Sequence, residues 1–142
     1  MTVASILAEK GRDVYTTGPG TTMSKAIDEL ASRKIGAIVV VDDDKLCGII
    51  SERDIVRELA KSGPPILGEP ISTCMTRQVI SCSESNTVDE VMAIMTANRF
   101  RHLPVVSGDR LTGIISIGDV VKRKIEQAER DAEDLRHYIA TA

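Results

Sequence analysis

Apolar residues follow two spacings along the chain, one typical of helices and one typical of strands. Between residues 21 and 31 they recur every three or four positions, which places them on one face of a helix. The stretch Ala37–Val41 is continuously apolar and β-branched, which predicts a strand buried on both faces. A polar turn at 42–45 separates it from a second strand, Leu46–Ser51, and a short strand at Val14–Thr16 precedes the helix. The predicted order is strand, helix, strand, strand, helix.

The same pattern occurs a second time. A shift of 65 positions aligns Val14–Arg57 with Val79–Lys122 without a gap, and 12 of the 44 pairs are identical. The identities concentrate in one segment, GIISxxD, which spans residues 48–54 and again residues 113–119. The second copy is therefore predicted to contain a strand at 79–82, a helix at 87–97, and strands at 102–106 and 111–116.

Three segments lie outside the aligned copies. Residues Thr2–Lys10 are predicted to form a helix that packs on one copy through Val3, Ile6 and Leu7. The connector between the copies is rich in glycine and proline, which predicts a loop with one short helical turn at 71–75. A long charged helix is predicted from Ile117 to Tyr138.

Composition narrows the possible functions. Aromatic residues make up 2% of the chain and the net charge is −3, so neither base stacking nor a basic phosphate-binding surface is expected, and no nucleic-acid partner is predicted. No apolar run approaches the roughly 18 residues of a membrane span. The three cysteines form no CxxC pair, so we expect small buried hydrophobic side chains, no metal site, and a reducing, cytoplasmic location.

The repeated segment ends where a strand runs directly into a helix. Ser51 falls at the N-cap of that helix, and free N–H groups of the first turn attract anions such as phosphate. Asp54 lies three residues further, where its carboxylate can accept hydrogen bonds from two ribose hydroxyls. The same spacing also forms a capping box in which both side chains satisfy only the helix end. The repetition of the segment weakens this second interpretation without removing it.

Basic residues gather before a strand of the second copy. Arg99, Arg101 and His102 precede Pro104, and near a bound phosphate they could supply forked, charge-assisted hydrogen bonds. The alternative is an exposed basic patch with no ligand. The residues alone leave both interpretations open.

Together, the two GIISxxD segments and the strand His102-Leu103-Pro104-Val105-Val106 resemble the CBS domain, the cystathionine β-synthase motif. The arrangement is similar to a tandem CBS pair, or Bateman module. The resemblance implies an α/β (α+β) fold: two βαββα repeats related by a pseudo-twofold axis, with a short N-terminal and a long C-terminal helix. The corresponding boundaries are repeat 1 at 11–61, a linker at 62–75, repeat 2 at 76–125 and a helical extension at 126–142.

The resemblance implies that an adenosine-bearing ligand binds in clefts between the copies. The ligand that the resemblance implies is AMP, ADP or ATP, with NAD(H) as a further candidate and S-adenosylmethionine ranked behind them. One nucleotide-binding cleft would combine residues of both copies: Ser51, Arg53, Asp54, Ile80, Arg101, His102, Leu103 and Pro104. The other would combine Ser116, Asp119, Tyr15, Gly36 and Ala37. In each cleft the aspartate would hold the ribose, and the serine with the helix end would hold phosphate.

The first cleft is expected to be the stronger phosphate site. Gly118 stands at the place of Arg53 in the second copy, and Gly36-Ala37 stand at the place of Arg101-His102 in the first. The second cleft therefore has fewer cations, and its extra room could suit the far half of a dinucleotide.

The sequence favours a regulatory protein over an enzyme. It contains no GxSxG, HExxH, Walker or GxGxxG motif. Two functions remain: a nucleotide sensor that acts on an unknown regulated protein, or an interaction module with vestigial clefts. A homodimer is predicted because the helices present apolar faces that one pair would leave uncovered: Met23, Ile27 and Leu30, then Val88, Val91, Met92 and Met95. The last helix extends that surface through Ile125, Ala128, Ala132, Leu135 and Ile139.

Overall fold

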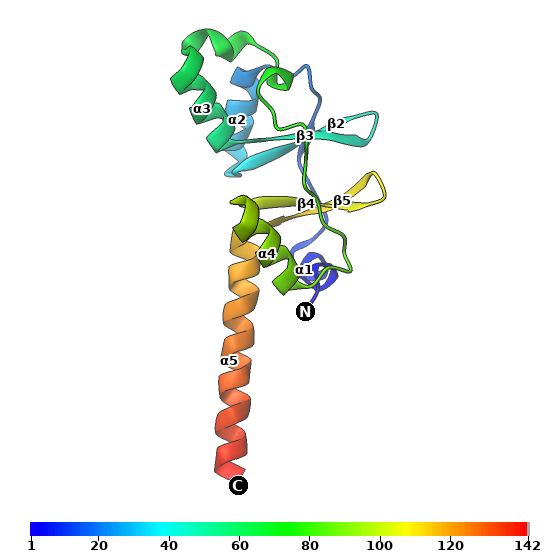
Figure 1. The fold of residues 1–142 in the computed structure, drawn as a ribbon, viewed down its shortest axis with the longest axis vertical. Helices are drawn as coiled ribbons and strands as arrows, with labels where there is room; N and C mark the ends of the chain where they lie inside the picture. Colours follow the sequence, from blue (N-terminus) through cyan, green and yellow to red (C-terminus); the bar gives the residue numbers. More distant parts are fainter. Residues whose placement is uncertain (142) are drawn as a thin grey trace.

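A computed structural model describes residues 1–141, and its two halves share one architecture (Figure 1). The first half contains β1 (Thr16–Thr17), α2 (Met23–Arg33), β2 (Ala37–Asp42), β3 (Lys45–Ser51) and α3 (Glu52–Ser62). The second half contains α4 (Val88–Asn98), β4 (His102–Ser107), β5 (Arg110–Ser116) and α5 (Ile117–Thr141). The predicted helices and hairpin strands are confirmed, with ends that differ from the prediction by a few residues.

The strand predicted at 79–82 is wrong for most of its length. Cys82 forms a parallel bridge with Val105, which is the counterpart of the β1–β2 pair between Thr17 and Val40. The bridge consists of two hydrogen bonds, from Cys82 N to the Pro104 carbonyl at 2.9 Å and from Val106 N to the Cys82 carbonyl at 2.8 Å. One bridging residue is too short a ladder to count as a strand.

The two hairpins meet in a sheet of order β1-β2-β3-β5-β4. Within the described residues, β3 and β5 pair at Lys45 and Arg110, beside the hairpin turns. Each hairpin has the same antiparallel register, and each carries an irregularity at the same place, Val40/Val41 in one and Val105/Val106 in the other. The repeat in the sequence is therefore also a repeat of backbone geometry.

A different segment covers each half, although both segments are held in the same way. Helix α1 (Val3–Lys10) covers the second half, and Val3 N donates to the Asn86 carbonyl at 2.9 Å. The connector contains two 3₁₀ helices, η1 (Pro64–Gly68) and η2 (Ile71–Thr73), where the sequence predicted one helical turn. Ile71 N donates to the Thr21 carbonyl at 2.8 Å, so η2 takes the place on the first half that α1 takes on the second.

The covering segments pack directly against the glycine of each GIISxxD segment, Gly48 in the first half and Gly113 in the second. An added Cβ at Gly113 would lie 2.8 Å from the Leu7 side chain, and one at Gly48 would lie 2.6 Å from the Met75 sulfur. Glycine is needed at both places because the covering side chains approach the strand backbone directly. The predicted packing of the N-terminal helix through Val3, Ile6 and Leu7 is confirmed, since all three are buried in the core of the second half.

Each half has its own apolar core, and the cores correct the predicted dimer surface. Most of the residues named for that surface are buried within the chain itself: Met23, Leu30, Val88, Val91 and Met95. Ile27 and Met92 are half-buried against the same cores. Helical periodicity showed that these faces are covered, but their own strands cover them.

The cysteines contribute to packing. Cys82 is buried, and burial raises the pKa of its thiol to about 11, so it remains a protonated, weakly polar group. None of the helices described in residues 1–141 combines the length and the apolar character needed to cross a membrane.

Candidate functional site

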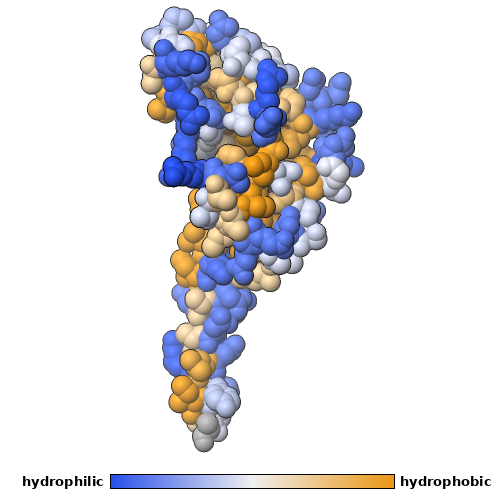
Figure 2. All heavy atoms as spheres, viewed as in Figure 1, coloured by the Kyte–Doolittle hydropathy of each residue, from blue (hydrophilic) through white to orange (hydrophobic). Residues whose placement is uncertain are grey.

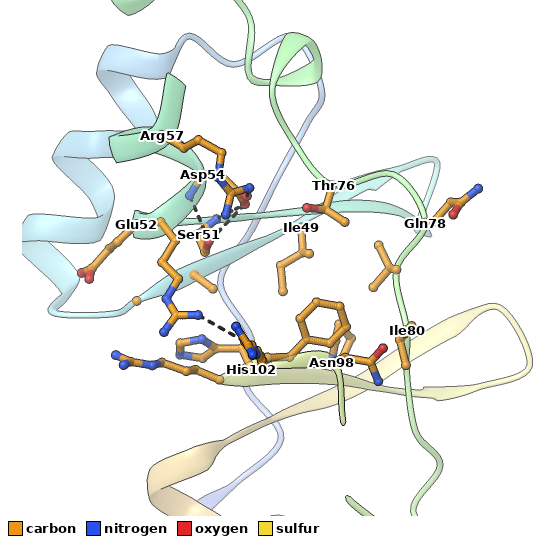
Figure 3. A pocket seen from close by; sticks show the side chains of 18 residues that line it. Ile49, Ser51, Glu52, Asp54, Arg57, Thr76, Gln78, Ile80, Asn98 and His102 are labelled. Atoms are coloured by element: carbon orange, nitrogen blue, oxygen red, sulfur yellow. Dashed lines mark hydrogen bonds and ion pairs between the residues drawn. The ribbon is translucent and has the colours of Figure 1, made fainter. Parts of the chain in front are cut away.

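A cavity of about 660 Å³ lies between the two halves, within the range of roughly 300–1,000 Å³ common for small-molecule sites. Figure 3 shows Ser51 and Asp54 at the start of α3 on one side, with Asn98 and His102 of the other half opposite them. The two halves and the connector supply its walls: Gly36, Ala37, Ile49, Ser51, Glu52, Arg53, Asp54, Arg57, Thr76, Gln78, Val79, Ile80, Asn98, Arg99, Phe100, Arg101, His102 and Pro104.

The first turn of α3 forms the polar corner of this cavity. Ser51 is the N-cap in extended conformation, and its Oγ accepts a hydrogen bond from Asp54 N at 3.3 Å. Asp54 Oδ2 accepts in return from Ser51 N at 2.9 Å and from Ser51 Oγ at 3.1 Å. The capping box is therefore present, yet it also holds a half-buried carboxylate at the cavity wall. Capping and ligand binding are compatible at this corner, because a carboxylate has about four acceptor sites.

Four arginines make the cavity positively charged: Arg53, Arg57, Arg99 and Arg101. Arg53 reaches across the cavity, and its Nη1 donates to the Arg99 carbonyl at 3.2 Å. Arg57 Nη1 lies 4.0 Å from Asp54 Oδ1. Against these four cations stand two lining carboxylates, Glu52 and Asp54, so the cavity favours an anionic ligand.

His102 lies where the two halves meet at the strand starts. A Cβ added to Gly36 would lie 2.9 Å from His102 Cε1, so the imidazole packs against the glycine. Burial lowers the pKa of His102, and the charges of Lys10 and Arg101 act in the same direction, while Glu52 and Asp119 oppose them. The imidazole is therefore held in its neutral form near pH 7.

The equivalent corner of the second half is closed by the chain itself. Asp119 Oδ2 accepts from Ser116 N at 2.8 Å, as its counterpart does in the first half. Lys10, at the end of α1, donates to the same Asp119 oxygen at 2.7 Å and to the Ile114 carbonyl at 3.0 Å. Burial alone would raise the pKa of Asp119, but the hydrogen bonds from Lys10 and Ser116 outweigh it and lower the pKa.

The structure brings most residues of the first predicted cleft together. Seven of its eight members line the cavity: Ser51, Arg53, Asp54, Ile80, Arg101, His102 and Pro104. Leu103 instead points into the core and is fully buried. Gly36 and Ala37, predicted for the second cleft, line this same cavity.

The residues predicted for the second cleft make other contacts within the chain. Ser116 and Asp119 form their corner, but Lys10 occupies it. Tyr15 packs at the edge of the first core, and the Arg33 guanidinium lies 3.8 Å from its ring centroid. Lys10 and Arg33 thus contact two of the residues predicted for this cleft, Asp119 and Tyr15.

Several lining residues were outside the predicted set, among them Arg57, Phe100 and Gln78. Arg57 could have been found by helical spacing, because it lies one turn after Arg53 on the same face. Lys10 offered no such signal, since it stands outside the aligned copies.

Known proteins are similar to this chain in sequence and in architecture. The sequence profile of the CBS domain matches residues 4–61 and 71–126. The solved structure of a CBS-domain-containing protein from Agrobacterium tumefaciens is 46% identical, with a TM-score of 0.84, and the match covers 87% of this chain and 99% of that one. The CBS domain pair of protein MJ0100, solved in complex with 5′-methylthioadenosine and S-adenosyl-L-methionine, is 28% identical, with a TM-score of 0.80 over 89% of this chain and 98% of that one.

A longer relative contains the same unit. Inosine-5′-monophosphate dehydrogenase of Thermoplasma acidophilum is 40% identical over 124 residues, which are 86% of this chain and 24% of the enzyme. This chain thus spans about a quarter of the dehydrogenase. With both copies matched by the family profile and the paired fold shared with solved members, the chain belongs to the CBS-domain family as a tandem pair, a regulatory module.

Proposed function

We propose that this CBS pair binds an adenine nucleotide in the cavity between its halves and passes the bound state to a regulated protein. AMP, ADP and ATP are the primary candidates, and NAD(H) carries the same adenosine half. The cavity is the observation that carries this proposal. It joins a carboxylate, a helix N-terminus and four arginines across the boundary between the halves.

Each part of a nucleotide has a suitable group in this cavity. Asp54 can accept hydrogen bonds from both ribose hydroxyls, because its corner already holds the carboxylate in place. At the start of α3, Glu52 N already donates to the Gly36 carbonyl at 3.1 Å and Asp54 N to Ser51 Oγ at 3.3 Å. Phosphate oxygens can therefore bind the Arg53 N–H at the positive end of the helix, and arginine side chains can add charge-assisted bonds. The apolar part of the wall, Ile49, Ile80 and Pro104, suits the adenine ring.

The arginines favour phosphate-bearing ligands over S-adenosylmethionine. The sulfonium of S-adenosylmethionine is positively charged, so four arginines around it would oppose binding. The MJ0100 pair, whose solved complex contains 5′-methylthioadenosine and S-adenosyl-L-methionine, supports recognition of the adenosine half by this fold. The charge of the part of the ligand beyond adenosine then distinguishes the candidate ligands.

Ligand binding would act through the contact between the halves. A ligand held by both halves stabilises one relative arrangement of the two, and a partner protein can recognise that arrangement. We infer a non-catalytic role, because the cavity presents binding groups and the sequence carries no recognised catalytic motif.

Calorimetric titration of the full chain tests this function. AMP, ADP, ATP, NAD, NADH, S-adenosylmethionine and GMP are compared at one salt concentration. Phosphate-bearing adenosine compounds are expected to bind, and GMP and S-adenosylmethionine are expected to bind at least tenfold more weakly. Absence of binding by every adenosine compound would favour the alternative, an interaction module with vestigial clefts.

Asp54→Asn identifies the site. Loss of hydrogen bonds to a charged acceptor costs roughly 1.5–3 kcal/mol, so nucleotide affinity should fall about 10- to 100-fold. Glu90→Gln is the matched control, because Glu90 belongs to the Thr87 capping box of α4, away from the cavity. Equal loss in both variants would mean that helix capping, rather than ribose binding, explains the effect.

A further inference from the structure

The end of α5 projects away from the rest of the molecule as a single helix (Figure 1). The CBS profile ends at residue 126, whereas α5 continues to Thr141. The Agrobacterium structure is matched over 99% of its own length and covers 87% of this chain. The projecting segment, residues 127–141, thus lies beyond the part of the chain that the CBS profile matches.

Apolar residues form a continuous stripe along α5. They follow one another at spacings of 4, 3, 4, 3 and 4 residues: Val121, Ile125, Ala128, Ala132, Leu135 and Ile139. This alternation is the heptad pattern of a coiled coil, with Ile125, Ala132 and Ile139 at a positions and the others at d positions. Figure 2 shows hydrophobic residues along one side of the projecting helix.

The stripe is uncovered in the single chain. Ile125 is 54% exposed, Leu135 60% and Ile139 65%. Amphipathic helices gain most of their stability from packing of the apolar face. A partner that covers the stripe would stabilise the projecting segment.

Charges beside the stripe identify the partner. In a parallel pair, each g position faces the e position five residues later on the other helix. Lys124 then faces Glu129 of a second copy, and Asp131 faces Arg136, so both pairs are of opposite sign. Lys124 also donates to Asp89 of its own chain at 2.7 Å, and its ammonium has donors for both carboxylates.

The antiparallel arrangement that pairs all six apolar positions brings like charges together instead. It places Val121 beside Ile139 of the second copy, and then Glu129 faces Glu129 and Asp131 faces Asp131. Like charges at these positions oppose association. Ile at a positions with Leu at a d position also favours parallel two-stranded coils.

We propose that the C-terminal part of α5 pairs with the same helix of a second copy as a parallel coiled coil. This contact is independent of the nucleotide cavity, and it holds two CBS pairs with their bodies at the same end of the coil. It replaces the predicted dimer surface on the repeat helices, whose named residues are buried or half-buried in the cores of the same chain.

Sedimentation of the full chain over a hundredfold concentration range tests the pairing. A dimer is expected, and Leu135→Asp should raise its dissociation constant at least tenfold, because it places two carboxylates in an apolar layer. His137→Asp is the matched control, since it adds the same side chain on the outer face of the same helix. A monomeric wild-type chain, or a dimer that Leu135→Asp leaves unchanged, would overturn the proposal.

A cysteine at position 139 tests the direction of the pairing. In the parallel coil, Ile139→Cys places two thiols in one layer, within the roughly 7 Å between Cα atoms that a disulfide requires. In the antiparallel arrangement described above, the two positions lie 18 residues apart, about 27 Å along the axis. Rapid disulfide dimerisation is expected for Ile139→Cys and not for wild type or the outer-face control His137→Cys. Reaction no faster than that of the control would overturn the parallel direction.

Discussion

The two GIISxxD corners have the same sequence pattern and backbone geometry but different surroundings. In the first corner the Ile49 carbonyl accepts from Thr76 N at 2.9 Å, and Asp54 faces the cavity. In the second corner the equivalent Ile114 carbonyl accepts from the Lys10 ammonium at 3.0 Å, and the same ammonium binds Asp119. One corner is open to a ligand, and the other already holds a cation.

The covering segments explain the difference. On the first half, η2 ends at Thr73, and the segment that follows lines the cavity wall through Thr76, Gln78, Val79 and Ile80. On the second half, α1 continues for eight residues and ends at Lys10, directly over the corner. A short repeated motif therefore determines the shape of a corner, while the segment that crosses it determines access.

Shortening Leu7, which anchors α1 on the second half, should give the largest loss of stability. Leu7 is 1% exposed and packs against Gly113, so Leu7→Ala should lower the free energy of unfolding by about 2–5 kcal/mol. Chemical denaturation measures the loss. Val56→Ala, at a side chain that is 65% exposed, is the control and should change stability by less than about 0.5 kcal/mol. Similar values for both variants would mean that α1 is not firmly docked.

Removing only the Lys10 ammonium should have a smaller effect on stability and a clear effect on nucleotide binding. The Lys10–Asp119 pair is partly exposed, so Lys10→Met should cost roughly 0.2–1 kcal/mol of stability. It should also free Asp119 and add a second, weaker nucleotide-binding event to the calorimetric titration. Lys25→Met, at an exposed lysine of α2, should leave the stoichiometry unchanged. A single binding event in Lys10→Met would show that the ammonium is not what closes the second corner.

The sequence predicted the regular elements well, because their apolar spacing reflects how each one packs. The stretch Ala37–Val41 became β2 with one added residue, and the capping threonine of α2 lies where the helical pattern begins. The strand at 79–82 failed because pairing depends on a partner strand, and Cys82 alone meets β4. Apolar periodicity also could not distinguish a face covered by its own strands from one covered by a second chain.

For the site, too, the sequence predicted the local groups but not the contacts between distant segments. Repetition pointed to Ser51 and Asp54, and the basic cluster pointed to Arg101 and His102; the structure places all four around one cavity. Lys10 could not be predicted, because it lies 109 residues from Asp119 in sequence and outside the aligned copies. Contacts between distant segments depend on how the covering helix lies, and spacing within one copy carries no information about that.

The charges of Glu52 in the first corner and Asp119 in the second both act on His102. Its titration should change stability less than the substitutions above. Burial lowers the pKa of His102 below its usual 6.5, so the unfolded chain binds more protons than the folded chain as the pH falls. The contribution of His102 to stability is therefore complete above pH 6.5 and declines as the pH falls from there through the folded-state pKa. Thermal unfolding between about pH 7.5 and 5.5 should show this decline in wild type and a weaker one in His102→Gln.

The second histidine supplies the control for this titration. His137 is exposed on α5 and lies outside the cavity, so His137→Gln serves as the matched histidine substitution. A bound phosphate near His102 would favour the imidazolium, so nucleotide should raise the pKa of His102, which the NMR shift of its Cε1 proton reports. If the phosphate lies in the first corner, nucleotide should raise the pKa of His102 in wild type. It should not raise this pKa in Asp54→Asn at the same ligand concentration. A rise of equal size in both proteins would place the phosphate elsewhere than the first corner.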